Sequence, residues 1–119
     1  MKKIYHLATC DTCKRIINEI NLPTSFEKRE IKQQEITVKE LESLAALSGS
    51  YEALFSKRAK LYKERGLKDE VLSEDDYKRF ILEHYTFLKR PVIVNGNEIF
   101  IGNSKKTVEA AKVSIQSNS

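Results

Sequence analysis

Two cysteines, Cys10 and Cys13, are the side chains of this sequence best suited to chemistry, and they are its only cysteines. Their C-x-x-C spacing is typical of thiol–disulfide chemistry or of half a zinc site. A site with two cysteines and two histidines would have to use both of them together with His6 and His84, at a spacing unlike that of a zinc finger. We therefore predict a redox-active pair, no metal and no bound cofactor.

The residues around Cys10 place it between a strand and a helix. Residues 2–8 form a short, partly apolar run that predicts a buried strand, and a helical period of apolar residues begins after Asp11. Free backbone N–H groups and the helix dipole stabilise an anion at such a helix start, which lowers the pKa of a cysteine. Cys10 is therefore the predicted nucleophile, and Cys13, one turn later, could resolve a mixed disulfide. The structural alternative is a pair of buried, unreactive cysteines.

The rest of the chain must supply the elements that position this pair. Residues 25–31 alternate weakly, and their charges suit an edge strand. Residues 37–87 look helical throughout, in stretches opened by the capping-box residues Thr37 and Ser73, with a further helix from about 52 to 65 between them.

The strongest local signal is a hairpin after this helical region. Residues 91–94 and 98–101 predict two strands joined by Asn95-Gly96, a pair favoured where both central residues need a positive φ. Ser104 can cap a last helix that runs to about residue 115. The polar tail over residues 114–119 is expected to fray.

The order strand, helix, strand, helical region, hairpin, helix predicts the α/β fold class. The first two strands would be parallel with a right-handed crossover, and the hairpin would add antiparallel strands. The result is a thioredoxin-like, four-stranded mixed sheet flanked by helices, with a helical insert. We predict one domain over residues 1–119, with a core of about 2–35 and 88–115 and an insert of about 37–87.

Composition and charge restrict the function classes. The chain has 119 residues, 40% of them hydrophobic and 32% charged, which is typical of a globular protein and not of a disordered one. No apolar run is long enough for a membrane span or a signal peptide, so we expect a cytoplasmic protein with no membrane partner. Positive and negative residues are interleaved, so the net charge of +4 does not predict direct nucleic-acid binding.

Three further residues are candidates for the site. In a thioredoxin-like fold, a proline at the start of the third strand faces the dithiol, usually after a cis bond, and Pro91 has this place; a strand-initiating proline is the alternative. Arg90 adjoins it, so its guanidinium would lie close to the Cys10 sulfur and could bind an oxyanion or stabilise a thiolate. His6 lies four residues before Cys10 and could favour the thiolate or accept its proton, or could be a packing histidine.

Several segments together resemble the arsenate-reductase-like (ArsC) family, including its Spx and YffB branches. The resemblance extends from residue 3 to about residue 112 and includes Ile4-Tyr-His, Cys10-Asp-Thr-Cys-Lys, Glu52-Ala-Leu-Phe-Ser-Lys-Arg, Leu88-Lys-Arg-Pro-Val-Ile-Val and Ile101-Gly. It implies a thioredoxin-like core with a helical insert, and a catalytic or redox-sensing cysteine at Cys10.

The positions of the arginines help to distinguish the branches of this family. Arsenate reductases of this family typically bind the oxyanion with three arginines, of which Arg90 matches the one before the proline. The first position falls at Ser56, with Arg58 two residues later as in Spx and YffB, and the third falls near Gly102, where those branches also carry glycine. Since the loss of one charge-assisted contact of about 1.5–3 kcal/mol reduces a rate tenfold or more, the resemblance implies poor arsenate reduction.

Other residues match different branches. His6 resembles the arsenate reductases. Cys13 resembles Spx, whose C-x-x-C disulfide switch controls an interaction with RNA polymerase. Asp11 and Thr12 resemble YffB, a proposed glutathione-dependent thiol reductase.

We therefore expect a thiol-based oxidoreductase that acts on a small-molecule thiol, disulfide or oxyanion. Cys10 would attack, and Cys13, glutathione or thioredoxin would resolve the adduct, with glutaredoxin as a possible partner. The remaining candidate site residues are Arg58, Arg90, Pro91 and His6. The alternative is an Spx-like redox-sensing transcriptional regulator that binds an RNA polymerase subunit through a Cys10–Cys13 disulfide switch, with residues 48–50 as a contact surface.

Overall fold

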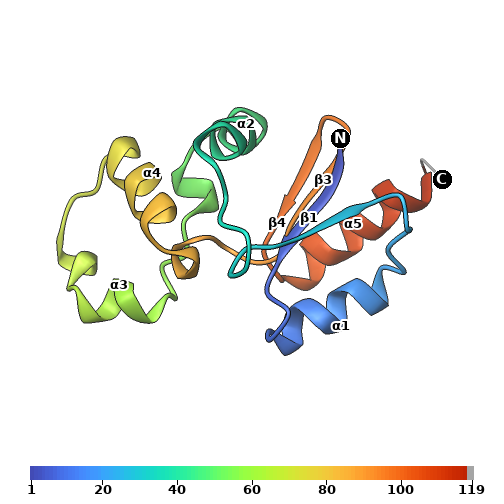
Figure 1. Ribbon diagram of the computed structural model, residues 1–119, viewed down its shortest axis with the longest axis horizontal. Coiled ribbons are helices and arrows are strands. Elements are labelled where there is room, and N and C mark those ends of the chain that lie inside the picture. Colours follow the sequence, from blue (N-terminus) through green and yellow to red (C-terminus); the bar gives the residue numbers. More distant parts are fainter. Residues whose placement is uncertain (118–119) are drawn as a thin grey trace. The chain divides into compact units, whose positions relative to one another are not determined.

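The computed structural model describes residues 1–117, which form α-helices, strands and short 3₁₀ helices (Figure 1). In chain order the elements are β1 (Lys2–His6), α1 (Asp11–Glu19), β2 (Glu27–Glu30), α2 (Val38–Ser48), η1 (Glu52–Leu54), α3 (Lys60–Glu64), η2 (Leu67–Asp69), α4 (Glu74–Glu83), η3 (Tyr85–Phe87), β3 (Val92–Asn95), β4 (Glu98–Ile101) and α5 (Lys105–Ser117). The label η marks the 3₁₀ helices.

These elements belong to two compact units. The first unit consists of Met1–Gln34 and the chain from Arg90 onward, and it contains the sheet, α1 and α5. The second unit, Glu35–Lys89, contains the other helices. The Cys10 region and the Arg90-Pro91 segment, which are far apart in the sequence, therefore belong to the same unit.

The sheet confirms the predicted thioredoxin-like, mixed topology. Its strand order is β2-β1-β3-β4, with β1 parallel to β2 and antiparallel to β3, and β3 antiparallel to β4. The charged strand β2 lies at an edge, as its sequence predicts. Because a parallel pair needs a crossover connection, α1 runs between β1 and β2.

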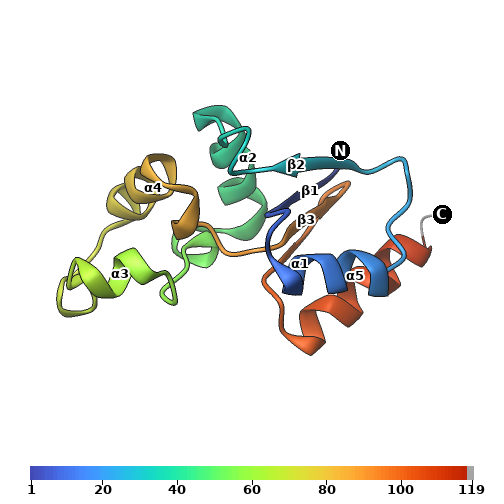
Figure 2. The ribbon, with the colours of Figure 1, turned by 60° about the horizontal axis from the view of Figure 1, so that its bottom comes forward.

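One face of the sheet packs against α1 and α5, which Figure 2 shows side by side. The shared core consists of buried apolar side chains from the sheet, from both helices and from the loop before β2: Ile4, Ile16, Ile20, Phe26, Ile93, Val108, Ala111 and Ile115. Burial of each large aliphatic side chain contributes roughly 1.5–3 kcal/mol. This packing fixes α1, and with it the helix start that carries Cys10.

The hairpin turn lies one residue later than predicted. Asn95 pairs with Glu98, so the two turn residues are Gly96 and Asn97, of which Gly96 has a positive φ of 67°. The side-chain amide of Asn95 is buried and donates a hydrogen bond of 2.9 Å to the Ser114 hydroxyl. That hydroxyl in turn donates to a carboxylate oxygen of Glu98 at 2.7 Å. Asn95 therefore belongs to the strand because its amide finds a buried partner there.

The prediction of a frayed tail is wrong for residues 114–117. Helix α5 continues to Ser117, and Ser114 and Ile115 are buried against the sheet unit. The hydroxyl of Ser114 contributes to this packing through its two hydrogen bonds. Residues 118–119 of the predicted tail lie outside the described residues.

The prediction that residues 37–87 are helical throughout is also wrong. Both predicted capping boxes are present, at Thr37 and Ser73. The helix expected over residues 52–65, however, is broken between η1 and α3, where Phe55 forms an isolated antiparallel bridge with Leu88. Its neighbour Ser56 donates a backbone hydrogen bond of 2.7 Å to Phe87. Helix α4 ends at Glu83 and does not include His84 or Tyr85. His84 is instead the N-cap residue of the 3₁₀ helix η3, which begins at Tyr85.

The break has a cause in the packing of aromatic rings. Phe55 is completely buried, and its ring centroid lies 4.8 Å from that of Tyr77 and 5.4 Å from that of Phe87. The ring reaches this position because the chain is extended at Phe55. Tertiary packing therefore overrides the local helix propensity.

Candidate active site

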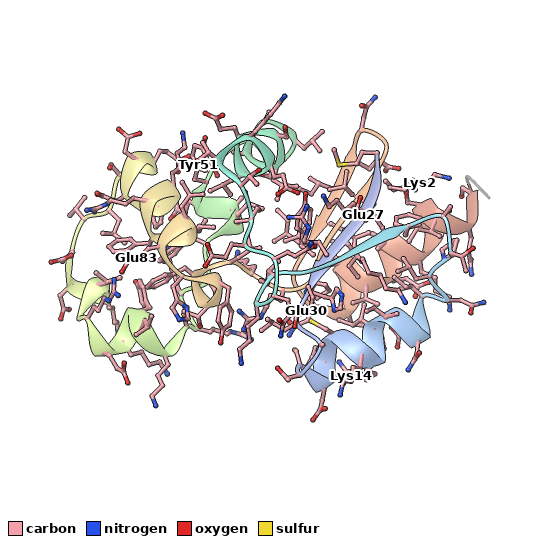
Figure 3. The ribbon with its side chains drawn as sticks, in the orientation of Figure 1. Lys2, Lys14, Glu27, Glu30, Tyr51 and Glu83 are labelled. Atoms are coloured by element: carbon pink, nitrogen blue, oxygen red, sulfur yellow. The ribbon has the colours of Figure 1, made fainter. Side chains whose placement is uncertain are left out.

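Cys10 is the N-cap residue of α1, with an extended backbone (φ −88°, ψ 110°). Its N–H donates to the carbonyl of Leu7 at 3.1 Å, which closes the turn between β1 and the helix. Its own carbonyl accepts the first helical hydrogen bond, from Lys14 at 3.1 Å. Figure 3 labels Lys14 near the start of α1. The side chain of Cys10 is half-buried, so an external reagent can reach its sulfur.

The surroundings of Cys10 favour its thiolate. Partial burial raises its pKa, but the N–H and S–H groups of Cys13, the positive charge of Arg90 and the backbone N–H of Thr12 outweigh that effect, so that the pKa is lowered. The sulfur makes no capping hydrogen bond of ordinary geometry, so the lowered pKa reflects the combined electrostatic effect of these groups. Lowering the pKa of a thiol raises its thiolate fraction at neutral pH, and the thiolate is the nucleophile.

Cys13 has the opposite character. Its side chain is completely buried on the core-facing side of α1. This burial, together with the hydrogen bond to Cys10 and the repulsion by its charge, raises the pKa of Cys13 to about 11, although the backbone N–H of Leu7 and the charge of Arg90 oppose the rise. Cys13 is therefore a protonated hydrogen-bond donor to Cys10 at neutral pH. The two sulfurs are adjacent, as a disulfide between them would require.

Arg90 and Pro91 form the second part of the arrangement, immediately before β3. The peptide bond between them is cis, and the carbonyl of Pro91 accepts a hydrogen bond of 2.9 Å from the N–H of Gly102. The guanidinium of Arg90 lowers the pKa of both cysteines. Gly102 stands out in the sequence only through the family resemblance, and nothing in its residue type indicates that its N–H donates a hydrogen bond to Pro91.

Replacement of Arg90 by methionine is expected to raise the pKa of Cys10. The variant keeps an unbranched side chain but removes the positive charge that stabilises the thiolate. The measurement is the absorbance of the thiolate at about 240 nm during a pH titration, with Arg15→Met, an exposed residue of α1, as the matched control. An unchanged titration midpoint in Arg90→Met would contradict this role.

His6 is placed differently from the other candidates. It is the last residue of β1 and pairs with Glu30 of β2. Burial lowers its pKa, Glu30 and the backbone of Leu7 oppose this, and Lys28 adds to it. The groups that act on His6 thus lie mainly on β2, whereas those that shift Cys10 lie on α1 and before β3. A role of His6 in tuning Cys10 stays a prediction.

Arg58 lies in the second unit, in the turn between η1 and α3, and not within a helix as predicted. Its side chain is exposed. The structure therefore groups Cys10, Cys13, Arg90 and Pro91 within the first unit, and Arg58 stays a predicted site residue on the insert.

Within residues 1–117, no three His, Cys, Asp or Glu side chains are grouped so that they could hold a metal ion. In the same range, no helix combines the length and the apolar composition that a membrane span requires.

Comparison with known proteins places this arrangement in a family. The profile of the ArsC family matches residues 5–111. A protein named global transcriptional regulator Spx 2, from Bacillus anthracis, is 28% identical over 109 residues, which cover 86% of this chain and 79% of that protein. An arsenate reductase from Haemophilus influenzae is 33% identical over 78 residues, which cover 64% of this chain and 67% of the enzyme.

A solved structure shows the same fold. The arsenate reductase from Vibrio cholerae superimposes with a TM-score of 0.76 at 23% identity, with 96% of each chain covered. The family profile spans the Cys10 helix start, the insert and the Arg90-Pro91 segment alike. The chain belongs to the ArsC family.

Proposed function

We propose that this protein is a thiol-based oxidoreductase in which the Cys10 thiolate attacks a disulfide. The observation that carries the proposal is the half-exposed Cys10 sulfur at the start of α1, with a lowered pKa and the Cys13 thiol beside it. A reducing compartment such as the cytoplasm would keep both sulfurs as thiols between reactions.

The reaction is thiol–disulfide exchange. The Cys10 thiolate attacks one sulfur of a disulfide, a bond forms between the two sulfurs, and the other half of the disulfide leaves as a thiolate. Cys13, after losing its proton, can then attack the Cys10 sulfur, which forms the Cys10–Cys13 disulfide and releases the rest of the substrate as a thiolate. Alternatively, an external thiol such as glutathione or thioredoxin attacks the substrate sulfur of the mixed disulfide. Cys10 then leaves as a thiolate, which Arg90 and the first turn of α1 stabilise.

Other substrates place different demands on the site. An oxyanion such as arsenate carries spread negative charge, and Arg90 is the guanidinium that acts on Cys10 within the first unit. Arg58 would have to supply a second contact from the insert. Pro91 would border the bound substrate beside Arg90. We therefore propose disulfides as the better substrates.

The test is a reaction of the reduced protein with glutathione disulfide, followed by intact-mass analysis and peptide mapping. The expected product is one glutathione adduct on Cys10, or the Cys10–Cys13 disulfide if Cys13 attacks that adduct and releases glutathione. Added glutathione should reduce the adduct to the free thiol, with release of glutathione disulfide. With 2-hydroxyethyl disulfide and glutathione, steady turnover should follow. A protein that forms neither an adduct on Cys10 nor a Cys10–Cys13 disulfide would disprove the proposal.

A second candidate function is a redox-sensing regulator. It is favoured by the relative named as a global transcriptional regulator, which matches 86% of this chain. A Cys10–Cys13 disulfide would then change affinity for an RNA polymerase subunit. Pull-down of purified polymerase subunits with the reduced and the oxidised protein separates the two functions. The oxidoreductase hypothesis predicts no redox-dependent binding to these subunits, whereas the regulator hypothesis requires it.

A further inference from the structure

The end of the sheet next to Cys10 is also the end at which α5 begins. Both β1 and β4 are antiparallel to β3, and the register places Tyr5, Val92 and Ile101 in one row across the three strands. β1 and β4 therefore run in the same direction and, with β3 between them, lie roughly 10 Å apart. The chain leaves β1 toward Cys10 and leaves β4 toward α5, and Figures 1 and 2 show α1 and α5 beginning at this same end.

One hydrogen bond joins the loop before α5 to the candidate site. The N–H of Gly102, in the loop before α5, donates to the carbonyl of Pro91, the residue after Arg90. Ser104 then caps the helix by accepting a hydrogen bond of 3.2 Å from the N–H of Thr107. The loop that leads into α5 is thus held to the segment whose guanidinium acts on the Cys10 thiolate.

The first turn of α5 carries Lys105 and Lys106, both exposed, and no acidic residue. Positive charge at a helix N-terminus is opposed by the helix dipole, so the lysines weaken this helix end. Within the described part of the chain, neither lysine forms an ion pair that would compensate. A charge that opposes the helix dipole, at the end of the sheet that carries Cys10, points to a role other than stability.

We propose that Lys105 and Lys106 make Cys10 selective for disulfides that carry negative charge near the S–S bond, such as those with carboxylate groups. The inference rests on the function proposed above. An anionic disulfide is repelled by the attacking thiolate, so positive charge near the sulfur would speed its reaction relative to that of a neutral disulfide. Arg90 supplies one such charge, and the lysine pair would supply two more from the same end of the sheet.

The test uses three disulfides that share an ethylene spacer: cystamine, which is cationic, 2-hydroxyethyl disulfide, which is neutral, and 3,3′-dithiodipropionate, which is anionic. For Lys105→Glu/Lys106→Glu, the rate constant of adduct formation with the anionic disulfide should fall about three- to tenfold relative to the neutral one, and that of cystamine should rise. Glutamate suits the first turn of a helix, so the variant should remain folded, which circular dichroism checks.

The matched control is Lys2→Glu/Lys112→Glu, which changes the net charge by the same amount. Lys2 pairs with Asn95, next to the hairpin turn at the opposite end of the sheet, and Lys112 lies in the middle of α5. This control should keep the wild-type order of the three disulfides. An increase in ionic strength should reduce the wild-type preference for the anionic disulfide.

Two outcomes would overturn the inference: an unchanged ratio of rates in Lys105→Glu/Lys106→Glu, or an equal change in the control. Failure of the proposed function is a separate result. In that case the wild-type protein would form neither a Cys10 adduct nor a Cys10–Cys13 disulfide, even with the neutral disulfide.

Discussion

The Cys10→Ser substitution is expected to lower the rate of reaction with a disulfide or with iodoacetamide by at least about a thousandfold relative to the wild type. A hydroxyl is not ionised at neutral pH, so the groups that now stabilise the Cys10 thiolate have no anion to act on. The measurement is the second-order rate constant of alkylation of the reduced protein, with the modified residue located by peptide mass spectrometry.

The matched variant is Cys13→Ala. Because Cys13 is completely buried, its removal should leave the reaction at Cys10 in place. It also removes a hydrogen-bond donor to the Cys10 thiolate, so the pKa of Cys10 should rise. In the wild type the alkylation rate should reach its plateau at a lower pH than that of an unstructured cysteine peptide, and in Cys13→Ala the midpoint should move upward. Equal alkylation of Cys10→Ser and wild type would assign the reactivity to Cys13 instead.

Truncation of Phe55 to alanine is expected to lower the free energy of unfolding by about 3–5 kcal/mol. The side chain is completely buried and contacts the rings of Tyr77 and Phe87 in the middle of the insert. Its loss leaves a cavity that the bridge between Phe55 and Leu88 prevents the backbone from filling. The measurement is urea unfolding followed by circular dichroism and by tyrosine fluorescence.

Tyr85→Ala is the control for this truncation. It removes an aromatic ring from the same unit, but that ring is only half-buried and stacks on the ring of its neighbour His84. A loss well below that of Phe55→Ala is therefore expected. If both variants unfold at the same urea concentration as the wild type, the aromatic cluster does not stabilise the insert.

The sheet was predictable because its signals are local. The alternation of apolar residues, the proline before the third strand and the glycine of the turn each act over a few residues, and together they limit the topology. The register of the hairpin was not predictable, because Asn95 is held in the strand by Ser114, a partner far along the chain. The broken helix at Phe55 has the same kind of cause, since its ring packs with residues of later elements.

The candidate site divides in a similar way. The position of Cys10 at a helix start follows from neighbouring residues, and so does its lowered pKa. The sequence also predicts that Arg90 lies near the sulfur, but only through the place of Pro91 opposite the dithiol in a thioredoxin-like fold, and in the structure the charge of Arg90 acts on Cys10. The contribution of Gly102 depends on a backbone N–H, which every residue except proline carries, so no residue type could indicate it.

The first unit is assembled from two separate stretches of chain, with the insert between them. During synthesis, Cys10 leaves the ribosome with the first stretch, whereas Arg90 and the strand that pairs with β1 follow only after the insert. A nascent or truncated chain that stops within the insert therefore carries a cysteine without the cation that sharpens its reactivity. The full shift of the Cys10 pKa therefore requires residues that are synthesised after the insert.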